Sequence, residues 1–496
     1  MICKPAASVL CGTACALALS ACAVGPNYHR PSAPPSKLFK EEQGWTPAAP
    51  AQIANEQWWS IYKDPVLSAL EQQVEVSNQN VKVAVANYYA AREAITVDRS
   101  GFFPSISLGA GATRSGGGSR NETLTVVGAG VLPSGTGSHT LYDADASASW
   151  DLDIWGKLRR EVESDVARAQ EDAADIAAAR LSAQDTLAQD YFQLRAAEQE
   201  LRILQTTVQD YKVSLQIAQN QVNAGTTTLA DVYSARTQLE DTIAQENSVQ
   251  LTRDEMEHAI AVLVGKAPSQ VSLAQGEFTA TVPVVPAGVP SQLLLRRPDI
   301  AAAERALESA NAQIGVAEAA WFPSLTLTGS YGYESTALST LIRASNSVWS
   351  FGPSLAEPLF NAGATLAQVR ENQALYDSAV ATYRETVLTA FQQVENDLAT
   401  LKHLQTEYTE DEAAVIDAER SATLTLNQYR AGTVAYSSVI VAQTALYTAQ
   451  ITELNVQSQR LVASADLVDA IGGGWSSGQL NARNDGVTAT LKSTLD

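Results

Sequence analysis

Few residues of this 496-residue chain have the types and spacing that chemistry requires. The four histidines, His29, His139, His258 and His403, lie far apart in the sequence and lack the spacing of metal ligands. The sequence also contains no phosphate-binding loop, nucleophile elbow or dinucleotide fingerprint. It therefore predicts no enzyme, no metal site and no bound cofactor. The alternative of a secreted enzyme would need a polar catalytic constellation, and none is visible.

Cys22 is the residue with the clearest chemical expectation. Lys4 is followed by an apolar run to Leu19, which is long enough for a signal peptide but short for a spanning helix. The run ends in Leu19-Ser20-Ala21-Cys22, a pattern typical of a bacterial lipobox, in which cleavage precedes the cysteine and lipid is attached to it. The alternative is a cleavage site of small residues followed by an incidental cysteine.

Cleavage before Cys22 would leave one cysteine in the mature chain, because the other three lie in the signal. A disulfide within one chain and thiol catalysis are then both excluded, and the covalent lipid is the only attached group expected. Ala23 follows the cysteine, at the position where aspartate would retain a lipoprotein in the inner membrane. The expected location is the outer membrane.

The charge of the chain limits its partners. The formal net charge is -21, and loss of Lys4 with the signal changes it to -21 - 1 = -22. Nucleic acid is not an expected partner, since phosphate binding needs clustered basic residues. After the signal, no run of 18 apolar residues occurs, so membrane-spanning helices are not expected.

A second polar cluster, Arg296-Arg297-Pro298-Asp299, suggests catalysis or anion binding at first sight. Pro298 and Asp299, however, suit the first turn of a helix, where the acid is favourably placed against the helix dipole. The cluster is therefore predicted to be structural.

The elements that would position these residues occur twice, about 200 residues apart. The segment 102–108 returns as 321–327, and the turn 223–226 returns as 430–433. This period is too long for a solenoid, so it indicates one duplication of a large unit. The predicted segments are, in order, a signal peptide (1–21), a lipidated tether (22–63), a first repeat (64–265), an equatorial linker (266–297), a second repeat (298–471) and a polar tail (472–496).

Each repeat is predicted to contain two strands. The four strands are expected at about 104–113, 144–155, 324–333 and 348–357. From 144 to 154 every even position is apolar and every odd one polar, as in a strand with one face in lipid or a core and the other in water. Asp145, Asp151 and Asp153 are then expected on an inner, wet face. The alternative is the edge of a soluble sandwich.

Four strands cannot close a membrane barrel, because spanning barrels start at about eight strands and an open edge leaves backbone groups unpaired in lipid. Closure must come from several chains related by cyclic symmetry. The stretches 114–142 and 334–347 are then expected to be surface loops.

Helices make up the rest of each repeat. Asp64-Pro65 starts a helix that is expected to reach about residue 99. The 66 residues from 157 to 222 contain no proline and would span about 99 Å as a helix. With a shorter returning helix, each copy forms a helical hairpin, at about 157–264 and 363–470, with coiled-coil spacing. A plain helical bundle is the alternative.

The first of three motifs that carry a family resemblance is Gly25-Pro26-Asn27-Tyr28-His29-Arg30-Pro31. The others are Trp58-Trp59 with Asp64-Pro65, and Leu294-Leu295-Arg296-Arg297-Pro298-Asp299-Ile300. Together they resemble the outer-membrane lipoproteins of tripartite, RND-type efflux systems, the NodT group of the TolC-like outer membrane factor family. The resemblance implies an α+β membrane protein, a trimer with a twelve-stranded β-barrel, four strands per chain. This barrel would continue into a long periplasmic α-helical barrel with an equatorial belt.

The function implied by the resemblance is passive conduction, with no bond made or broken. The homotrimer would sit in outer-membrane lipid and connect to a periplasmic membrane-fusion adaptor and an inner-membrane RND-type transporter. Its cargo stays open among drugs, aromatic compounds, oligosaccharides and metal ions, although a methionine relay is not expected because processing leaves only Met256. The alternatives are a structural or adhesive lipoprotein, or a channel for protein or oligosaccharide secretion.

The resemblance also implies a gate at the hairpin tips, with ring residues at Ser437 and Val441. The chain departs from the family here, because an acidic residue would align near Val441 and an arginine near Thr444. A lock made of charges is therefore not expected at that ring. Asp231, near the first tip, is the candidate for supplying negative charge, with a solvated surface acid as the alternative.

The turns between the paired helices are the candidate contacts for the adaptor. Their residues are Gly225 and Thr226 in the first hairpin and Gly432 and Thr433 in the second. These residues also serve as simple helix punctuation, with glycine supplying the left-handed turn.

Overall fold

The computed structural model describes residues 23–32, 39–42, 57–116, 125–127, 130–132, 138–278, 281–283, 296–478 and 480. These residues form two compact units. The sheet unit takes its described residues from 1–30, 90–169 and 305–380, and the helical unit takes its described residues from 31–89, 170–304 and 381–496. Each unit takes segments from both halves of the chain, so neither is one copy of the repeat. Cys22, the signal at 1–21 and the tail beyond 480 lie outside the described residues.

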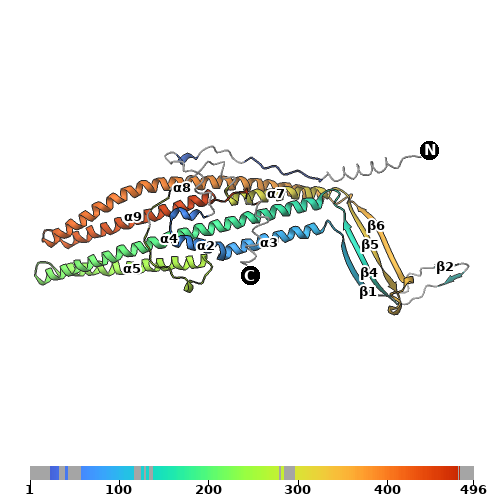
Figure 1. Ribbon diagram of the computed structural model, residues 1–496, viewed down its shortest axis with the longest axis horizontal. Coiled ribbons are helices and arrows are strands. Elements are labelled where there is room, and N and C mark those ends of the chain that lie inside the picture. Colours follow the sequence, from blue (N-terminus) through green and yellow to red (C-terminus); the bar gives the residue numbers. More distant parts are fainter. Residues whose placement is uncertain are drawn as a thin grey trace. The chain divides into compact units, whose positions relative to one another are not determined.

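The sheet unit contains four antiparallel strands in the order β1-β4-β5-β6 (Figure 1). They are β1 (Ser105–Ser115), β4 (His139–Asp151), β5 (Ser324–Ser335) and β6 (Ser347–Ala356). The pairing of β4 with β5 joins the strands of the two repeats into one sheet. The predicted four strands per chain are thereby confirmed.

The segment 114–142, predicted as a surface loop, contains more strand than expected. β1 and β4 keep pairing as far as Ser115 opposite His139. The short strands β2 (Thr125–Val127) and β3 (Gly130–Leu132) form a second antiparallel pair within the segment. Backbone hydrogen bonds between β1 and β4 extend both strands into this segment. The alternation of polar and apolar side chains does not show where such pairing ends.

Two helical hairpins account for most of the remaining residues (Figure 1). The first consists of α4 (Lys157–Asn223) and α5 (Leu229–Leu263), the second of α8 (Ala364–Arg430) and α9 (Tyr436–Ala470). The two long helices have 67 residues each and the two returning helices 35 each. The duplication is therefore preserved in the length of every helix of the hairpins.

The segment predicted as one helix from Asp64 is two helices, α2 (Pro65–Ser77) and α3 (Gln79–Ser100). Asp64 caps α2, since its Oδ1 accepts from the next backbone N–H groups, as the sequence predicts. The break lies at Asn78, whose backbone is extended with ψ of 128°. Its Oδ1 accepts from the first N–H groups of α3, and its Nδ2 donates to Leu263 O at 2.9 Å. A distant partner thus fixes the break.

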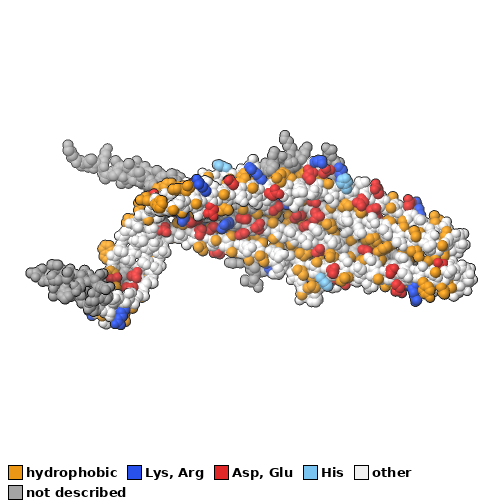
Figure 2. Space-filling model, turned by 180° about the vertical axis from the view of Figure 1, so that it is seen from behind, with side chains coloured by type: hydrophobic (Ala, Val, Ile, Leu, Met, Phe, Trp, Pro, Cys, Tyr) orange, Lys and Arg blue, Asp and Glu red, His pale blue; other side chains and the backbone are white. Residues whose placement is uncertain are grey.

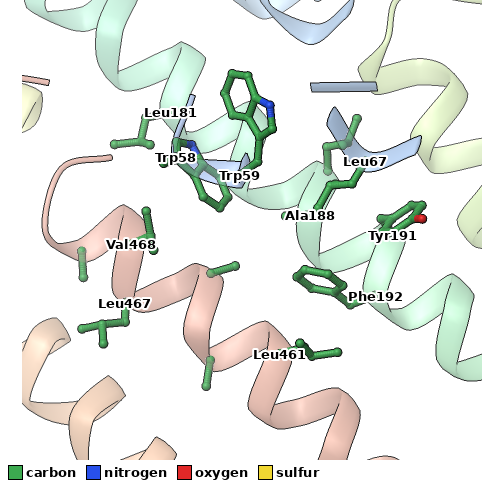
Figure 3. Packing of buried hydrophobic residues seen from close by; sticks show 14 of the residues in the cluster. Trp58, Trp59, Leu67, Leu181, Ala188, Tyr191, Phe192, Leu461, Leu467 and Val468 are labelled. Atoms are coloured by element: carbon green, nitrogen blue, oxygen red, sulfur yellow. The ribbon is translucent and has the colours of Figure 1, made fainter. Parts of the chain in front are cut away.

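The core of the helical unit surrounds an aromatic pair, Trp58 and Trp59, with ring centroids 6.1 Å apart (Figure 3). Both lie in the 3-10 helix η3 (Trp58–Tyr62), at the end of the predicted tether, and both are buried. Phe39 of the same tether is also buried in this core. These three aromatic residues contribute to the core although they lie within the predicted tether, because aromatic side chains bury large apolar areas.

Figure 2 shows that acidic side chains outnumber basic ones on the visible face of the described residues, in agreement with the net charge of -21.

Candidate functional site

The four-stranded sheet has one mainly polar and one mainly apolar face, with exceptions that include Leu141 and Val348 on the polar face and Arg114 and Thr140 on the apolar face. The pairing register places these residues on the polar face: Ser105, Ser107, Gly109, Gly111, Asp143, Asp145, Ser147, Ser149, Asp151, Thr326, Thr328, Ser330, Gly332, Glu334, Ser350, Gly352 and Ser354. The apolar face carries Ile106, Leu108, Ala110, Ala144, Ala146, Ala148, Trp150, Leu325, Leu327, Tyr331, Tyr333, Trp349, Phe351 and Leu355. Successive side chains of a strand point to opposite faces, so this register is what separates the two sets.

The apolar face is exposed. Leu108 is 86% exposed, Trp349 75%, Phe351 70% and Leu355 69%. A contiguous apolar surface of this kind marks contact with a membrane or a partner. Within the part of the chain that the structure describes, β1 and β6 each pair with one strand only, so the sheet also has two open edges.

Aromatic residues gather where the strands meet the helices. Phe103 precedes β1, Trp155 follows β4, Phe322 precedes β5 and Phe360 follows β6, so in an antiparallel sheet all four mark the same end. Trp155 and Phe322 stack with centroids 4.7 Å apart. We call these four positions the aromatic end. Such aromatics are typical of a membrane–water interface.

The acids of β4 do not all serve the inner face as predicted. Asp145 belongs to the polar face, and Asp151 accepts from Thr326 Oγ1 at 2.6 Å. Asp153 lies past the end of β4 and caps α4 instead. Its carboxylate accepts the N–H groups of Leu158 and Arg159 at 3.1 Å each and pairs with the Arg159 guanidinium. The alternation of polar and apolar residues continues through Asp153 in the sequence, although β4 ends at Asp151.

The two faces predict opposite responses to the same charge. We expect Phe351→Arg to destabilise the membrane-inserted state by about 2–4 kcal/mol, because the cation would face lipid. Ser350→Arg, one residue away on the polar face, is the matched control and should cost less than about 1 kcal/mol. Refolding into lipid vesicles under a urea titration measures both. Equal losses for the two variants would contradict the assignment of the faces.

The tips of the two hairpins pack against each other within the chain. Tyr429 and Tyr436 lie on either side of the second turn, with ring centroids 5.3 Å apart, and share a buried cluster with Ala235 and Val439. Gln221 Nε2 of the first hairpin donates to Tyr429 O at 3.4 Å. This tyrosine pair was not predicted from the sequence. The only signal was the position of the tyrosines on either side of the glycine turn.

Asp231 lies at this junction. Its carboxylate accepts a short hydrogen bond from Thr227 Oγ1. Burial, followed by the charge of Asp231, raises the pKa of Tyr429. Burial also raises the pKa of Tyr436 to about 12, with Tyr429, Tyr211 and Asp231 as further causes. The acid therefore belongs to the contact between the two tips.

Ser437 and Val441 lie on the exposed side of α9, where Val441 is 69% exposed. The turn residues Gly225, Thr226, Gly432 and Thr433 are exposed as well. The two glycines have φ of 70° and 75°. Each threonine hydroxyl donates back to a helix carbonyl, Thr226 Oγ1 to Gln221 O at 3.0 Å and Thr433 Oγ1 to Gln428 O at 2.9 Å. The structure thus distinguishes a half-buried Asp231 from the exposed Ser437 and Val441.

The cluster Arg296-Arg297-Pro298-Asp299 lies at the start of α7 (Pro298–Ala319). The buried Arg297 guanidinium donates to both carboxylate oxygens of Asp299, at 3.0 and 2.6 Å, and to Ala470 O at 2.9 Å. Asp299 Oδ1 also accepts from Ile300 N–H at 2.8 Å. These contacts fasten the beginning of α7 to the end of α9.

Among the described residues, no group of three or more His, Cys, Asp or Glu side chains is arranged to hold a metal ion. No described helix is both long and apolar enough to cross a membrane.

Comparison with known proteins gives this architecture a family. The family model for outer membrane efflux proteins matches residues 70–266 and 289–473. The chain belongs to this family. A probable outer membrane lipoprotein of Salmonella typhimurium, SilC, is 30% identical over 462 residues, which cover 91% of this chain and 95% of that protein.

Two further similarities agree with the family. The toluene efflux pump outer membrane protein TtgC of Pseudomonas putida is 30% identical over 477 residues, covering 94% of this chain and 96% of that protein. The solved outer-membrane channel OprN is 27% identical with a TM-score of 0.82, covering 92% of this chain and all of that one. The predicted outer-membrane location and the role of an efflux exit channel are confirmed, in preference to a structural or adhesive lipoprotein.

Proposed function

We propose that three copies of the chain form one channel through the outer membrane. The observation that carries this proposal is the sheet itself, whose exposed apolar face and two open edges require lipid and neighbouring strands. Pairing β1 of one chain with β6 of the next would give twelve strands and leave no edge in lipid. The polar face, with Asp143 and Asp145, would then line the lumen and conduct cargo passively.

The gate belongs at the hairpin tips in this proposal. Ser437 and Val441 are exposed on α9, so they are available for contact between three copies around the channel axis. Asp231 would act within each chain, since its charge acts on Tyr429 and Tyr436, the tyrosines that join the two hairpins. A gate built on Val441 closes by an apolar constriction and needs no charge pair.

The exposed turns at Gly225, Thr226, Gly432 and Thr433 are proposed as the contacts for a periplasmic membrane-fusion adaptor. Through the adaptor the channel would receive cargo from an inner-membrane RND-type transporter. Membership in the efflux family and the exposure of all four residues support this arrangement.

The lipid is proposed on Cys22, which lies outside the described residues. The lipobox-like segment and the printed description of SilC as a probable lipoprotein support it. No cofactor other than this covalent lipid is proposed.

Cysteine chemistry tests the trimer and the gate together. After processing, the wild-type chain retains only Cys22, whose thiol the lipid would block. We expect a cationic thiol reagent to reduce the bilayer conductance of Val441→Cys in three discrete steps, because each of the three copies presents one thiol at the constriction. The same reagent should leave wild-type conductance unchanged.

Single-channel recordings measure these steps. Thr406→Cys, at an exposed position on α8 well away from the turn at Gly432, is a second control and should show a smaller effect or none. A conducting Val441→Cys channel that the reagent does not affect would contradict the gate, and a single step would contradict the trimer.

A further inference from the structure

The residues that follow Cys22 are bound to the sheet unit by specific contacts. Val24 N–H donates to Trp155 O at 3.0 Å. The Arg160 guanidinium donates from Nε to Val24 O at 3.1 Å, and from Nη2 to Gly25 O at 3.1 Å and to Asn27 Oδ1 at 3.0 Å. Residues 23–27 therefore have a defined binding place on α4, and we call them the docking segment.

Arg160 is buried around this segment. Its side chain is 5% exposed, and its Nη1 donates to Glu163 Oε2 at 2.7 Å. Three of its four hydrogen bonds go to the docking segment. Removal of the segment would expose the site to water or leave buried donors of Arg160 unpaired, and both changes are unfavourable.

Glycines make room for the close approach of the segment. Gly25 has φ of 98°, and a Cβ on it would lie 2.4 Å from the Cα of Gly315. A Cβ on Gly315, inside α7, would lie 2.9 Å from Val24 O. Gly156 has φ of 83°, and a Cβ added to it would lie 2.8 Å from the Cα of Ala23. Glycine inside a helix costs stability, so its presence in α7 is explained by this contact.

Helix α7 also binds the docking segment through a hydrogen bond. Asn311 Nδ2 of α7 donates to Pro26 O at 3.0 Å. The helices α4 and α7 are themselves joined by Ser164, which shares a hydrogen bond with Ser309 at 2.8 Å and accepts one from Gln313 at 2.9 Å. The binding place for the segment therefore exists only when helices from the two halves of the chain have packed together.

We propose that this binding place is a receptor for the lipidated N-terminus, with Arg160 as its positioning residue, and that it holds acylated Cys22 at the aromatic end of the sheet. The inference rests on the proposed lipidation of Cys22. Ala23 contacts Gly156, the residue after Trp155, and Cys22 Cα lies within about 3.8 Å of Ala23 Cα by covalent geometry alone. The acyl chains therefore start beside the stack of Trp155 on Phe322.

This placement gives the lipid a second task besides attachment. A lipid on a loose tether would hold the protein near the membrane without orienting it. A lipid held at the aromatic end instead sets the depth at which the strands enter the bilayer. Since the receptor needs α4 and α7 together, only a chain with both halves packed places its lipid in this way.

The test uses the full-length, lipidated protein with a palmitate analogue that carries a photoreactive diazirine. We expect its cross-links in the wild type to map to residues near Trp155 and Phe322. In Arg160→Ala they should fall at least about fivefold at these positions, with the protein still acylated. Arg168→Ala removes an exposed arginine from the same helix and is the matched control, expected to keep the wild-type pattern.

Hydrogen exchange measured by mass spectrometry provides a separate readout. The peptide that contains Val24 should be protected in the wild type and exchange about tenfold or more faster in Arg160→Ala and in Gly315→Ala. The peptides of α7 should keep their protection, which separates loss of docking from loss of folding.

Three outcomes would overturn the proposal. They are fast exchange at Val24 in the wild type, an unchanged cross-link pattern in Arg160→Ala, and an N-terminal peptide without the acyl mass. The last result would identify the lipidation as the step that failed, since exchange at Val24 still reports on docking without it. Slow exchange combined with localised cross-links supports the proposal.

Discussion

Gly472→Ala is expected to lower the free energy of unfolding by at least about 3 kcal/mol, a large effect for one methyl group. Gly472 has φ of 94°, and a Cβ on it would lie 2.2 Å from Arg296 O and 2.7 Å from Arg296 C. These atoms belong to backbone that Arg297 and Asp299 hold against the end of α9, so they cannot move aside cheaply. The shift of the denaturation midpoint in detergent, followed by circular dichroism, measures the loss.

Gly432→Ala is the matched control. Gly432 lies in the turn just after α8 with φ of 75°, but a Cβ added to it would meet no atom within 4 Å. The Gly432→Ala variant should lose only about 1–2 kcal/mol of its free energy of unfolding, which is the cost of a left-handed conformation for an L-residue. Similar losses for the two variants would show that the backbone angle matters at Gly472 and the close approach does not.

Much of this fold is predictable from the sequence because it depends on short-range patterns. The period of two in the strands fixes which side chains share a face, and the turn glycines fix where the hairpins reverse. The helix start at Asp64 is equally local, since the cap and its partners lie within three residues. Such features need no knowledge of distant partners.

The features that the sequence did not predict depend on residues far apart in the chain. Asn78 breaks a helix because it also bonds to Leu263. Asp153 continues a strand pattern but serves α4. The receptor for the docking segment needs Gly25 opposite Gly315, and a single sequence does not show which glycine meets which.

The same limit applies to a group of buried acids in the helical unit. Asp185 of α4 lies near Asp466 of α9, and Gln189 Nε2 donates to a carboxylate oxygen of each at 2.7 Å. Glu71 of α2 is fully buried, and neither of its carboxylate oxygens has a hydrogen-bond partner among the described residues. Arg297 is the cation that acts on Asp397 and Asp469. Each of these acids looks like ordinary helix surface in the sequence.

Burial raises the pKa values of these acids and so makes stability depend on pH. Burial, then Asp469 and Asp466, raises the pKa of Asp185 to about 8, and burial, then the same two acids, raises that of Asp397 to about 7. Burial, reinforced by Asp185, raises the pKa of Glu71 well above its usual range. Between about pH 4 and pH 8 the folded chain therefore binds more protons than the unfolded chain, so the free energy of unfolding falls as pH rises.

Asp185→Asn is expected to remove a large part of this pH dependence. The amide carries no charge, so the free energy of unfolding of the variant should exceed that of the wild type by about 5 kcal/mol at pH 8. The two should match below about pH 3, where the wild-type carboxyl is protonated in both states. Denaturation in detergent at a series of pH values measures the difference. Asp241→Asn, at an exposed carboxylate on α5, should leave the pH dependence unchanged.

The sign of the pH effect decides between two roles for the cluster. If Asp185 were held as a carboxylate by an ion pair, its replacement would destabilise the protein most at pH 8 and least in acid. A stabilisation that grows with pH instead shows a neutral carboxyl, which costs free energy when ionised. Proton uptake on folding at pH 6, reduced by about one proton in Asp185→Asn, would give the same answer independently of unfolding free energies.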